Sequence, residues 1–187
     1  GQALQTVVPD TNTITTSMIQ DSAISSAKLS SGKVLQVVQG TTETEVTVTG
    51  TTFTDTTLTA SITPISTSSK ILILTSQSYY ARRSSSAYAL CGARLLRGTT
   101  AIWNPNPQDG NGSYGHGIVT TGTNMTVMNA YGTIDFNYLD TPSTTSATTY
   151  KTQIRAYTST GIVSAQQSGG SSEGDSKSSI ILMEISG

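Results

Sequence analysis

The sequence predicts an all-β protein, an antiparallel β-sandwich or jelly roll that is trimeric and carries a short N-terminal stalk. Three observations lead there. Ser and Thr make up about a third of the chain, and Thr suits a pleated, half-wet surface. Apolar and polar residues alternate through most of the chain, with turn residues at short intervals. An unusual apolar ladder lies near the start. We therefore divide the chain into a stalk or leader segment, 1–31, and a sandwich tip domain, 32–187.

The ladder consists of Ile14, Ile19, Ile24 and Leu29, one branched apolar residue every five positions. A five-residue step fits neither the period of a helix nor that of a strand. One chain alone cannot bury so thin a stripe, but identical chains wound side by side can point it at a shared axis. The spacing predicts an intertwined trimeric stalk. The alternative is a disordered leader rich in Ser and Thr, in which the spacing is chance.

After the leader, three segments alternate in the manner of half-buried strands: 57–62, 134–138 and 150–156. Each places an apolar residue at every second position or nearly so. Turn chemistry separates such runs throughout the domain, and we expect eight to ten strands. No segment shows a helical period with caps.

Four further segments are apolar on both faces or nearly so: 34–38, 70–74, 89–96 and 179–185. In an antiparallel fold of this size, one apolar face per strand suffices for the core. A second apolar face implies a second buried surface, and the simplest source is a neighbouring subunit. These strands therefore predict a homo-oligomer.

Charge and cysteine content exclude several classes of partner. The formal net charge is −1, and only 11% of the residues are charged. Such a neutral surface has no long-range field, so neither nucleic acid nor an acidic membrane is an expected partner. No stretch approaches the length of a membrane span. The lone Cys91 allows no intrachain disulfide and is expected to be a small buried hydrophobe.

The sequence predicts no catalytic residues, no cofactor and no metal. His116 is the single histidine, without a second ligand at metal spacing, although a threefold axis would leave a three-histidine site open. No nucleophile elbow is present. A glycosidase needs two facing carboxylates, and the candidates near the long loops are Asp109, Asp135 and Asp140. We expect Asp135 on a wet strand face and Asp140 in a turn.

Three segments are expected to be loops, 78–88, 103–117 and 167–176, and the first two are expected to bind a ligand. Sugar sites combine flat aromatic faces with polar groups that hold hydroxyls, and the first two loops offer both. Trp103 could instead close the core, and the doublet Arg82–Arg83 could be a solvated turn. Arg94 and Arg97 are expected to be structural or interfacial. The candidate ligand-binding residues are Tyr79, Tyr80, Arg82, Arg83, Tyr88, Trp103, Asn104, Asn106, Asp109, Tyr114 and His116.

The segment 19–29, IQDSAISSAKL, resembles the repeating leader of many marine bacteriophage tail fibres and related virion spikes. The segments 32–74, 139–154 and 178–187 resemble the C-terminal receptor-binding domain of the same proteins. The resemblance covers strand and turn residues and no catalytic ones. It implies a trimeric β-sandwich at the tip of a fibre, in contact with the host surface.

The expected function is therefore that of a non-catalytic adhesin in the tail fibre of an extracellular virion. Its expected partners are two further copies of itself, a glycan or outer-membrane protein of the host, and other tail proteins on its N-terminal side. One alternative is a purely structural fibre or decoration protein. Another is an enzyme that depolymerises capsule or lipopolysaccharide. A secreted trimer of the tumour-necrosis-factor or complement type would leave the leader repeat unexplained.

Overall fold

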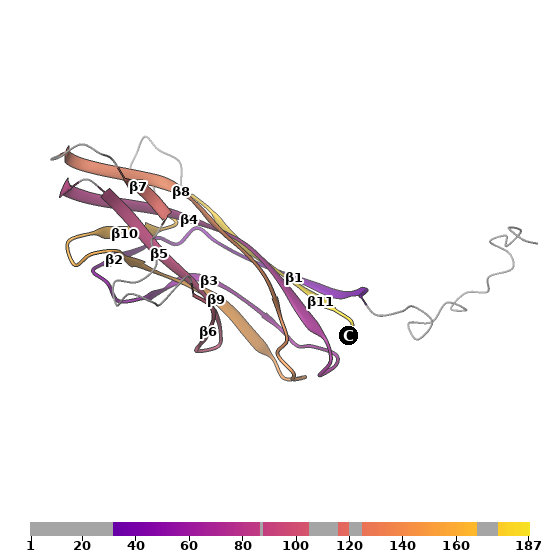
Figure 1. Ribbon diagram of the computed structural model, residues 1–187. Coiled ribbons are helices and arrows are strands. Elements are labelled where there is room, and N and C mark those ends of the chain that lie inside the picture. Colours follow the sequence, from indigo (N-terminus) through magenta and orange to yellow (C-terminus); the bar gives the residue numbers. More distant parts are fainter. Residues whose placement is uncertain (1–31, 87, 105–115, 120–124, 168–175) are drawn as a thin grey trace, which may run out of the picture.

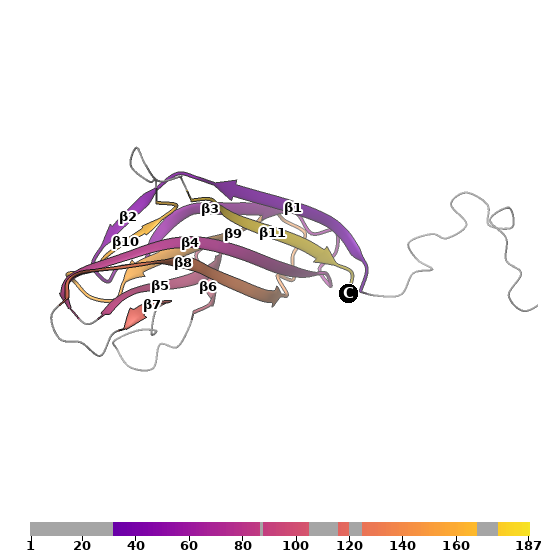
Figure 2. The same ribbon diagram turned by 90° about the horizontal axis from the view of Figure 1, so that it is seen from above.

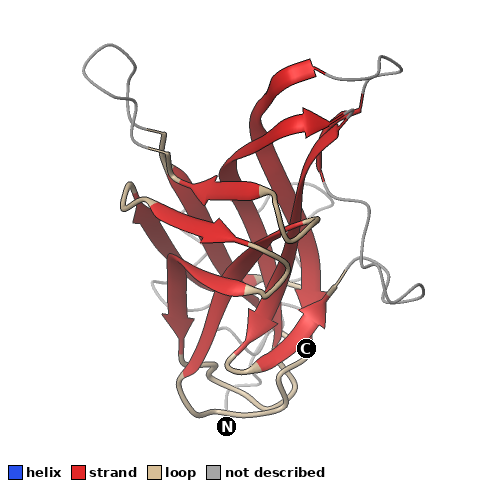
Figure 3. Cartoon of the chain, turned by 90° about the vertical axis from the view of Figure 1, so that its left-hand side faces the viewer, coloured by secondary structure: helices blue, strands red, loops and turns tan. Residues whose placement is uncertain are grey.

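The computed structural model describes residues 32–86, 88–104, 116–119, 125–167 and 176–187, and the predicted stalk lies outside them. The described residues form eleven strands and no helix (Figures 1 and 3). The strands are β1 (Val34–Thr42), β2 (Val46–Thr49), β3 (Thr54–Ile62), β4 (Lys70–Ser86), β5 (Tyr88–Arg97), β6 (Thr100–Trp103), β7 (His116–Val119), β8 (Met125–Asp140), β9 (Thr148–Ala156), β10 (Ile162–Ala165) and β11 (Ser178–Ile185).

The strands form two antiparallel sheets that lie face to face (Figure 2). In the first, here called the β4 sheet, the order is β1-β11-β4-β10-β2, and β8 pairs with the other edge of β4. The second, the β9 sheet, has the order β3-β9-β5-β6, with β7 also on β5. The predicted all-β class and the antiparallel pairing are confirmed, and the two layers are those expected of a sandwich.

The core lies between the sheets and follows the predicted alternation. In β3, Leu58, Ala60 and Ile62 are buried while the residues between them are exposed. The same pattern holds in β9 and in the second half of β8, and Cys91 is fully buried, as expected. Thr residues on the outer sides satisfy the β preference without adding to the core.

A buried polar network crosses from one sheet to the other near the middle of the core. The Gln77 Oε1 atom accepts hydrogen bonds from the hydroxyls of Thr56 (3.1 Å) and Thr152 (2.7 Å). With its amide oriented to suit its neighbours, Gln166 accepts from Gln77 Nε2 (2.6 Å) and Ser178 Oγ (2.7 Å) and donates to two backbone carbonyls. Buried polar groups satisfied in this way fix the register of the sheets against each other.

The two sheets approach closely where β1 crosses β3, at Gly40. A Cβ atom there would overlap the backbone carbonyl oxygen of Thr59. Neither backbone can yield without breaking ladder hydrogen bonds, so only glycine fits this position.

Two sequence-based predictions are wrong. The segment 78–88 is not a loop, because β4 runs on to Ser86 and β5 begins at Tyr88. From Tyr79 to Ser84 more buried and more exposed residues alternate as in a strand, and the polar run conceals this period. Asp140 is not a solvated turn residue: it is buried at the end of β8, bound by Arg97 (2.9 Å) and by the hydroxyl of Tyr150 (2.7 Å). That contact makes Arg97 structural, as expected.

Candidate functional site

A β-bulge in β3 creates the most distinctive local geometry on the outer side of the β9 sheet. The register between β3 and β9 shifts between Asp55 and Thr59, so β3 bends away from its neighbour. Thr57 lies in the bulge with a φ of 63°, a conformation rare for a β-branched residue. Its hydroxyl lies 2.9 Å from that of Thr42 and donates to the carbonyl of Thr44 at 3.3 Å. The β1–β2 connection thus holds the bulge open.

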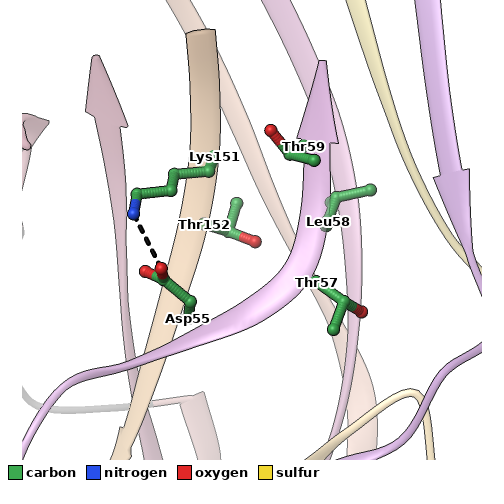
Figure 4. A pocket seen from close by; sticks show the side chains of 6 residues that line it. All are labelled: Asp55, Thr57, Leu58, Thr59, Lys151 and Thr152. Carbon is green, nitrogen blue, oxygen red and sulfur yellow. Dashed lines mark hydrogen bonds and ion pairs between the residues drawn. The ribbon is translucent and has the colours of Figure 1, made fainter. Parts of the chain in front are cut away.

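The bulge borders a hollow of about 160 Å³ between β3 and β9 (Figure 4). Three threonines, one leucine and one ion pair line it, and the hydroxyls of all three threonines are hydrogen-bonded within the protein. The ion pair joins Lys151 Nζ to Asp55 Oδ2 at 2.7 Å and is drawn as a dashed line in Figure 4. The lining residues are Asp55, Thr57, Leu58, Thr59, Lys151 and Thr152.

A row of hydrogen-bonded side chains runs from the hollow across three strands. Asp55 on β3, Gln153 on β9 and Arg94 on β5 lie opposite one another in the register. Gln153 Nε2 donates to Asp55 Oδ1, and Arg94 Nε donates to Gln153 Oε1, both at 2.7 Å. Burial acts to raise the pKa of Asp55, but hydrogen bonds from Lys151 and Gln153, together with nearby cations, hold that pKa below its ordinary value.

Beside this row, two guanidinium groups share one aromatic ring. The Arg94 and Arg155 Cζ atoms lie 4.2 Å and 4.8 Å from the ring centroid of Phe53. The stem of Arg155 lies over Gly92, where a Cβ atom would stand 3.1 Å from its Cγ. Stacking on an aromatic face and a flat glycine below it fix both side chains in place.

This surface, which we call the polar site, carries unbalanced positive charge. Arg94, Arg155 and Lys151 surround one carboxylate, Asp55, and that carboxylate pairs with Lys151. Neither arginine forms an ion pair with a carboxylate of the described residues. Burial and the neighbouring Arg155 charge lower the pKa of Arg94, against the opposing effect of Asp55. The cations thus remain available to a ligand.

The polar site supplies hydrogen-bond donors, hydroxyl groups and an aromatic ring, which are groups that hold a polar ligand. Its one carboxylate, that of Asp55, is held by two neighbours. Within the described ranges, no group of three His, Cys, Asp or Glu residues is placed to hold a metal ion. Among the described residues there is no helix long and apolar enough to cross a membrane.

The structure places the predicted ligand residues of 78–88 in strands rather than in one loop. Tyr79 is buried, with its ring against Gly132. Tyr80 lies on the outer side of the β4 sheet, with its ring 4.8 Å from that of Tyr131, and its hydroxyl donates to Asn129 at 2.9 Å. Arg82 is exposed on the same side, and Arg83 is half-buried.

The predicted residues of 103–117 are only partly within the described chain. Trp103 ends β6 and packs edge-on against Phe136, with 4.8 Å between ring centroids, which is the core-closing position weighed above. Asn104 is exposed just after it. Tyr88 and His116 lie in paired strands, β5 and β7. The predicted residues outside the described ranges are Asn106, Asp109, Tyr114 and the stalk residues Ile14, Ile19, Ile24 and Leu29.

Sequence reasoning missed the polar site because its residues looked like the ordinary wet side of half-buried strands. Outward positions of β9 hold Lys151, Gln153 and Arg155, which alternate with buried residues. The sequence predicts that Arg94 is structural or interfacial. The signal was present in the charge: three cations occur at outward positions of two strands in a chain that is poor in charge. The register across β3, β9 and β5 brings these cations to Phe53 and Asp55, and this register cannot be derived from the sequence pattern.

The outer side of the β4 sheet has the opposite character. Val37, Met183, Leu72 and Leu139 lie side by side in one row across β1, β11, β4 and β8. Val37 is 57% exposed and Leu139 50% exposed. The second apolar face predicted for 34–38, 70–74 and 179–185 is therefore confirmed, and β8 adds Leu139 to it, whereas the fourth predicted segment, 89–96, lies in β5 of the other sheet. We call it the apolar face, formed by Val34, Val37, Leu72, Leu74, Leu139, Ile181, Met183 and Ile185.

Comparison of the sequence with protein-family models and with curated proteins gives no match. The roles proposed for the polar site and the apolar face therefore rest on their residues and geometry.

Proposed function

We propose that this chain is the non-catalytic receptor-binding tip of a bacteriophage tail-fibre type of virion protein, a homotrimeric jelly roll that attaches the virion to a host-surface glycan. The observation that carries the proposal is the division of labour between the two outer surfaces. The polar site faces outward from one sheet, and the apolar face lies at one end of the other, where β4 begins. An adhesin of this kind needs both, one surface for the receptor and one for its own copies.

The apolar face supports the homotrimer. Four strands spaced about 4.8 Å apart, over about five residues of each strand, give the apolar face an area on the order of 300 Å², which is within the size range of exposed apolar patches that mark interaction sites. The 31 residues before Gly32 enter the domain at the same end, where the Gly32 N–H donates to the Ser186 carbonyl at 3.0 Å. A stalk joining three chains there would bring the three apolar faces together.

The polar site supports adhesion to a glycan. Sugar hydroxyls are held by planar polar side chains and hydroxyls, and an aromatic ring adds contact with C–H groups. The Asp55–Lys151 pair and Gln153 supply the first kind of contact, and Phe53, on which Arg94 and Arg155 stack, lies beside them. Weak single sites suffice on a fibre, because three copies bound at once multiply the affinity.

The experiment is attachment of the fluorescently labelled full chain to host bacteria and to their purified surface polysaccharides. Lys151→Ala should weaken attachment by about tenfold, because it removes a charge-assisted contact from the wall of the hollow. Thr149→Ala, an exposed change on the same strand, is the matched control and should have no effect. Equal attachment by Lys151→Ala and the native chain would favour the purely structural fibre protein. Release of reducing sugar from the polysaccharide would favour the depolymerase.

A further inference from the structure

Among the described residues, no carboxylate forms an ion pair with either guanidinium group of the polar site, that of Arg94 or that of Arg155. Arg94 uses its Nε to hold a neutral amide, Gln153. An Nη atom of Arg155 makes a long contact with the Thr51 carbonyl at 3.5 Å. Its own Nε is enclosed and has no hydrogen-bond partner within the same part of the chain. A buried donor left unpaired is costly, and two like charges on one ring repel each other.

The surroundings hold these two cations together despite that repulsion. Phe53 lies against both guanidinium groups, and the absent side chain of Gly92 gives the Arg155 stem its place on the sheet. A planar fork of donors fixed in this way fits a carboxylate or a sulfate, whose oxygens accept two hydrogen bonds at once. A surface that only needed solubility would not require such fixed positions.

We propose that Phe53, Arg94 and Arg155 form a subsite for the oxyanion group, a carboxylate or a sulfate ester, of an acidic saccharide whose sugar ring occupies the adjoining hollow. The inference rests on the proposed adhesive function and names its ligand class. The hollow and the guanidinium pair share one row, Asp55–Gln153–Arg94, so a single sugar can contact both. This shared row favours a saccharide over a bare anion.

The test is a titration of the full chain with three oligosaccharides. They are an oligogalacturonate, a sulfated oligosaccharide and the methyl-esterified, neutral form of the oligogalacturonate. At least one acidic oligosaccharide should bind about tenfold more tightly than the neutral ester, and the two acidic arms show which oxyanion is preferred. Its affinity should fall as salt is added, because the subsite is at the surface.

Two glutamine variants locate the subsite. Arg94→Gln and Arg155→Gln should each weaken the acidic oligosaccharide by about tenfold and leave the neutral ester unchanged. Lys177→Gln is the matched control, because it removes one positive charge from an exposed pair with Glu43 that is not part of the guanidinium pair. Gly92→Ala keeps every charge but displaces the Arg155 stem, so it should weaken the acidic ligand by a smaller factor, about threefold. Circular dichroism confirms that each variant is folded.

Three results would overturn the inference. Equal affinity for the neutral ester and the acidic forms would leave a sugar site without an oxyanion subsite, and the proposed function would stand. An equal loss in Lys177→Gln would show attraction by overall charge alone. Absence of binding by both acidic oligosaccharides would reject the ligand class, while attachment to host cells would still decide the proposed function separately.

Discussion

The two outer surfaces of the sandwich differ in polarity, although in both sheets buried and outward-facing residues alternate along the strands. On the β9 sheet, the outward positions hold Lys151, Gln153 and Arg155, joined to Asp55 and Arg94. On the β4 sheet, one row of four strands is entirely apolar, from Val37 to Leu139. Four of the five large apolar side chains that are most exposed among the described residues lie on this second surface.

The difference shows which surface needs a partner. Scattered apolar residues on a surface are ordinary, but a contiguous apolar row of a soluble protein marks an interaction site. Electrostatic repulsion does little to keep such faces apart in this chain, because only 11% of its residues are charged. The polar site must instead stay exposed, because its fixed cations could not bind a ligand if another copy of the chain covered them.

The change with the largest expected effect is Leu72→Asp, in the middle of the apolar row. A carboxylate there would be buried without a partner in the assembly, which costs several kcal/mol. Light scattering should show the mass falling from that of a trimer to the monomer mass of 19.5 kDa. Thr149→Asp places the same charge on the exposed side of the β9 sheet and should leave the mass unchanged. Dissociation by both variants, or by neither, would break the comparison.

The buried polar network ranks second, because it joins the two sheets whose surfaces differ. Gln77→Leu removes the acceptor of Thr56 and Thr152 and the donor to Gln166. The groups left unpaired should lower the free energy of unfolding by about 3 kcal/mol, measured by urea denaturation. Gln39→Leu, an exposed position on β1, is the control and should change it by less than about 0.5 kcal/mol. Both are best measured in the Leu72→Asp background, so that assembly does not contribute.

A third prediction concerns Glu184, the fully buried carboxylate of β11, which underlies the apolar face. Burial acts to raise its pKa, but hydrogen bonds from the Gln36 side chain and from backbone amides that include that of Ile65 hold the pKa below its ordinary value. A lowered folded pKa stabilises the protein above the unfolded pKa of 4.5, and this stabilisation is lost as pH falls through the folded pKa.

Glu184→Gln should therefore lower the free energy of unfolding at neutral pH by about 1–2 kcal/mol, because its amide would face donors. The loss should shrink as the pH drops below about 4, where the native carboxylate also becomes protonated. Urea denaturation at several pH values measures this. A constant difference across the whole range would show that the carboxylate charge does not matter.

The smallest effect is expected from Asp55→Asn on the polar site. Exposed ion pairs contribute little, so losing the contact with Lys151 should change the free energy of unfolding by less than about 1 kcal/mol. The same change should weaken attachment to glycan, because it disrupts the row from the hollow to Arg94. Thermal unfolding and glycan binding measured on one sample separate the two effects. A large loss of stability would make the polar site a structural element.

The sequence predicted those parts of the fold that depend on period alone. Alternation at 57–62 placed Leu58, Ala60 and Ile62 in the core, and the double apolarity of 70–74 and 179–185 predicted the second face. Prediction from the sequence failed for residues whose role depends on side chains of neighbouring strands. Asp140 looks like a turn residue until Arg97 and Tyr150 are seen beside it.

The polar site could not be predicted for the same reason. Phe53 and Arg155 are separated by a hundred residues of sequence and meet only because β3 and β9 are neighbours. The hollow depends on a one-strand bulge at Thr57, a threonine in a conformation that its residue type does not suggest. Register and bulges are set by the whole sheet, so a linear pattern does not reveal them.

The most direct test of the difference between the two surfaces is the mass of the native full chain in solution, measured by size exclusion with light scattering. We expect a particle of three times 19.5 kDa that does not dissociate on dilution, with the apolar faces covered and the polar sites open. A stable particle of 19.5 kDa would contradict this account, because the apolar face would then lie open to water without a partner.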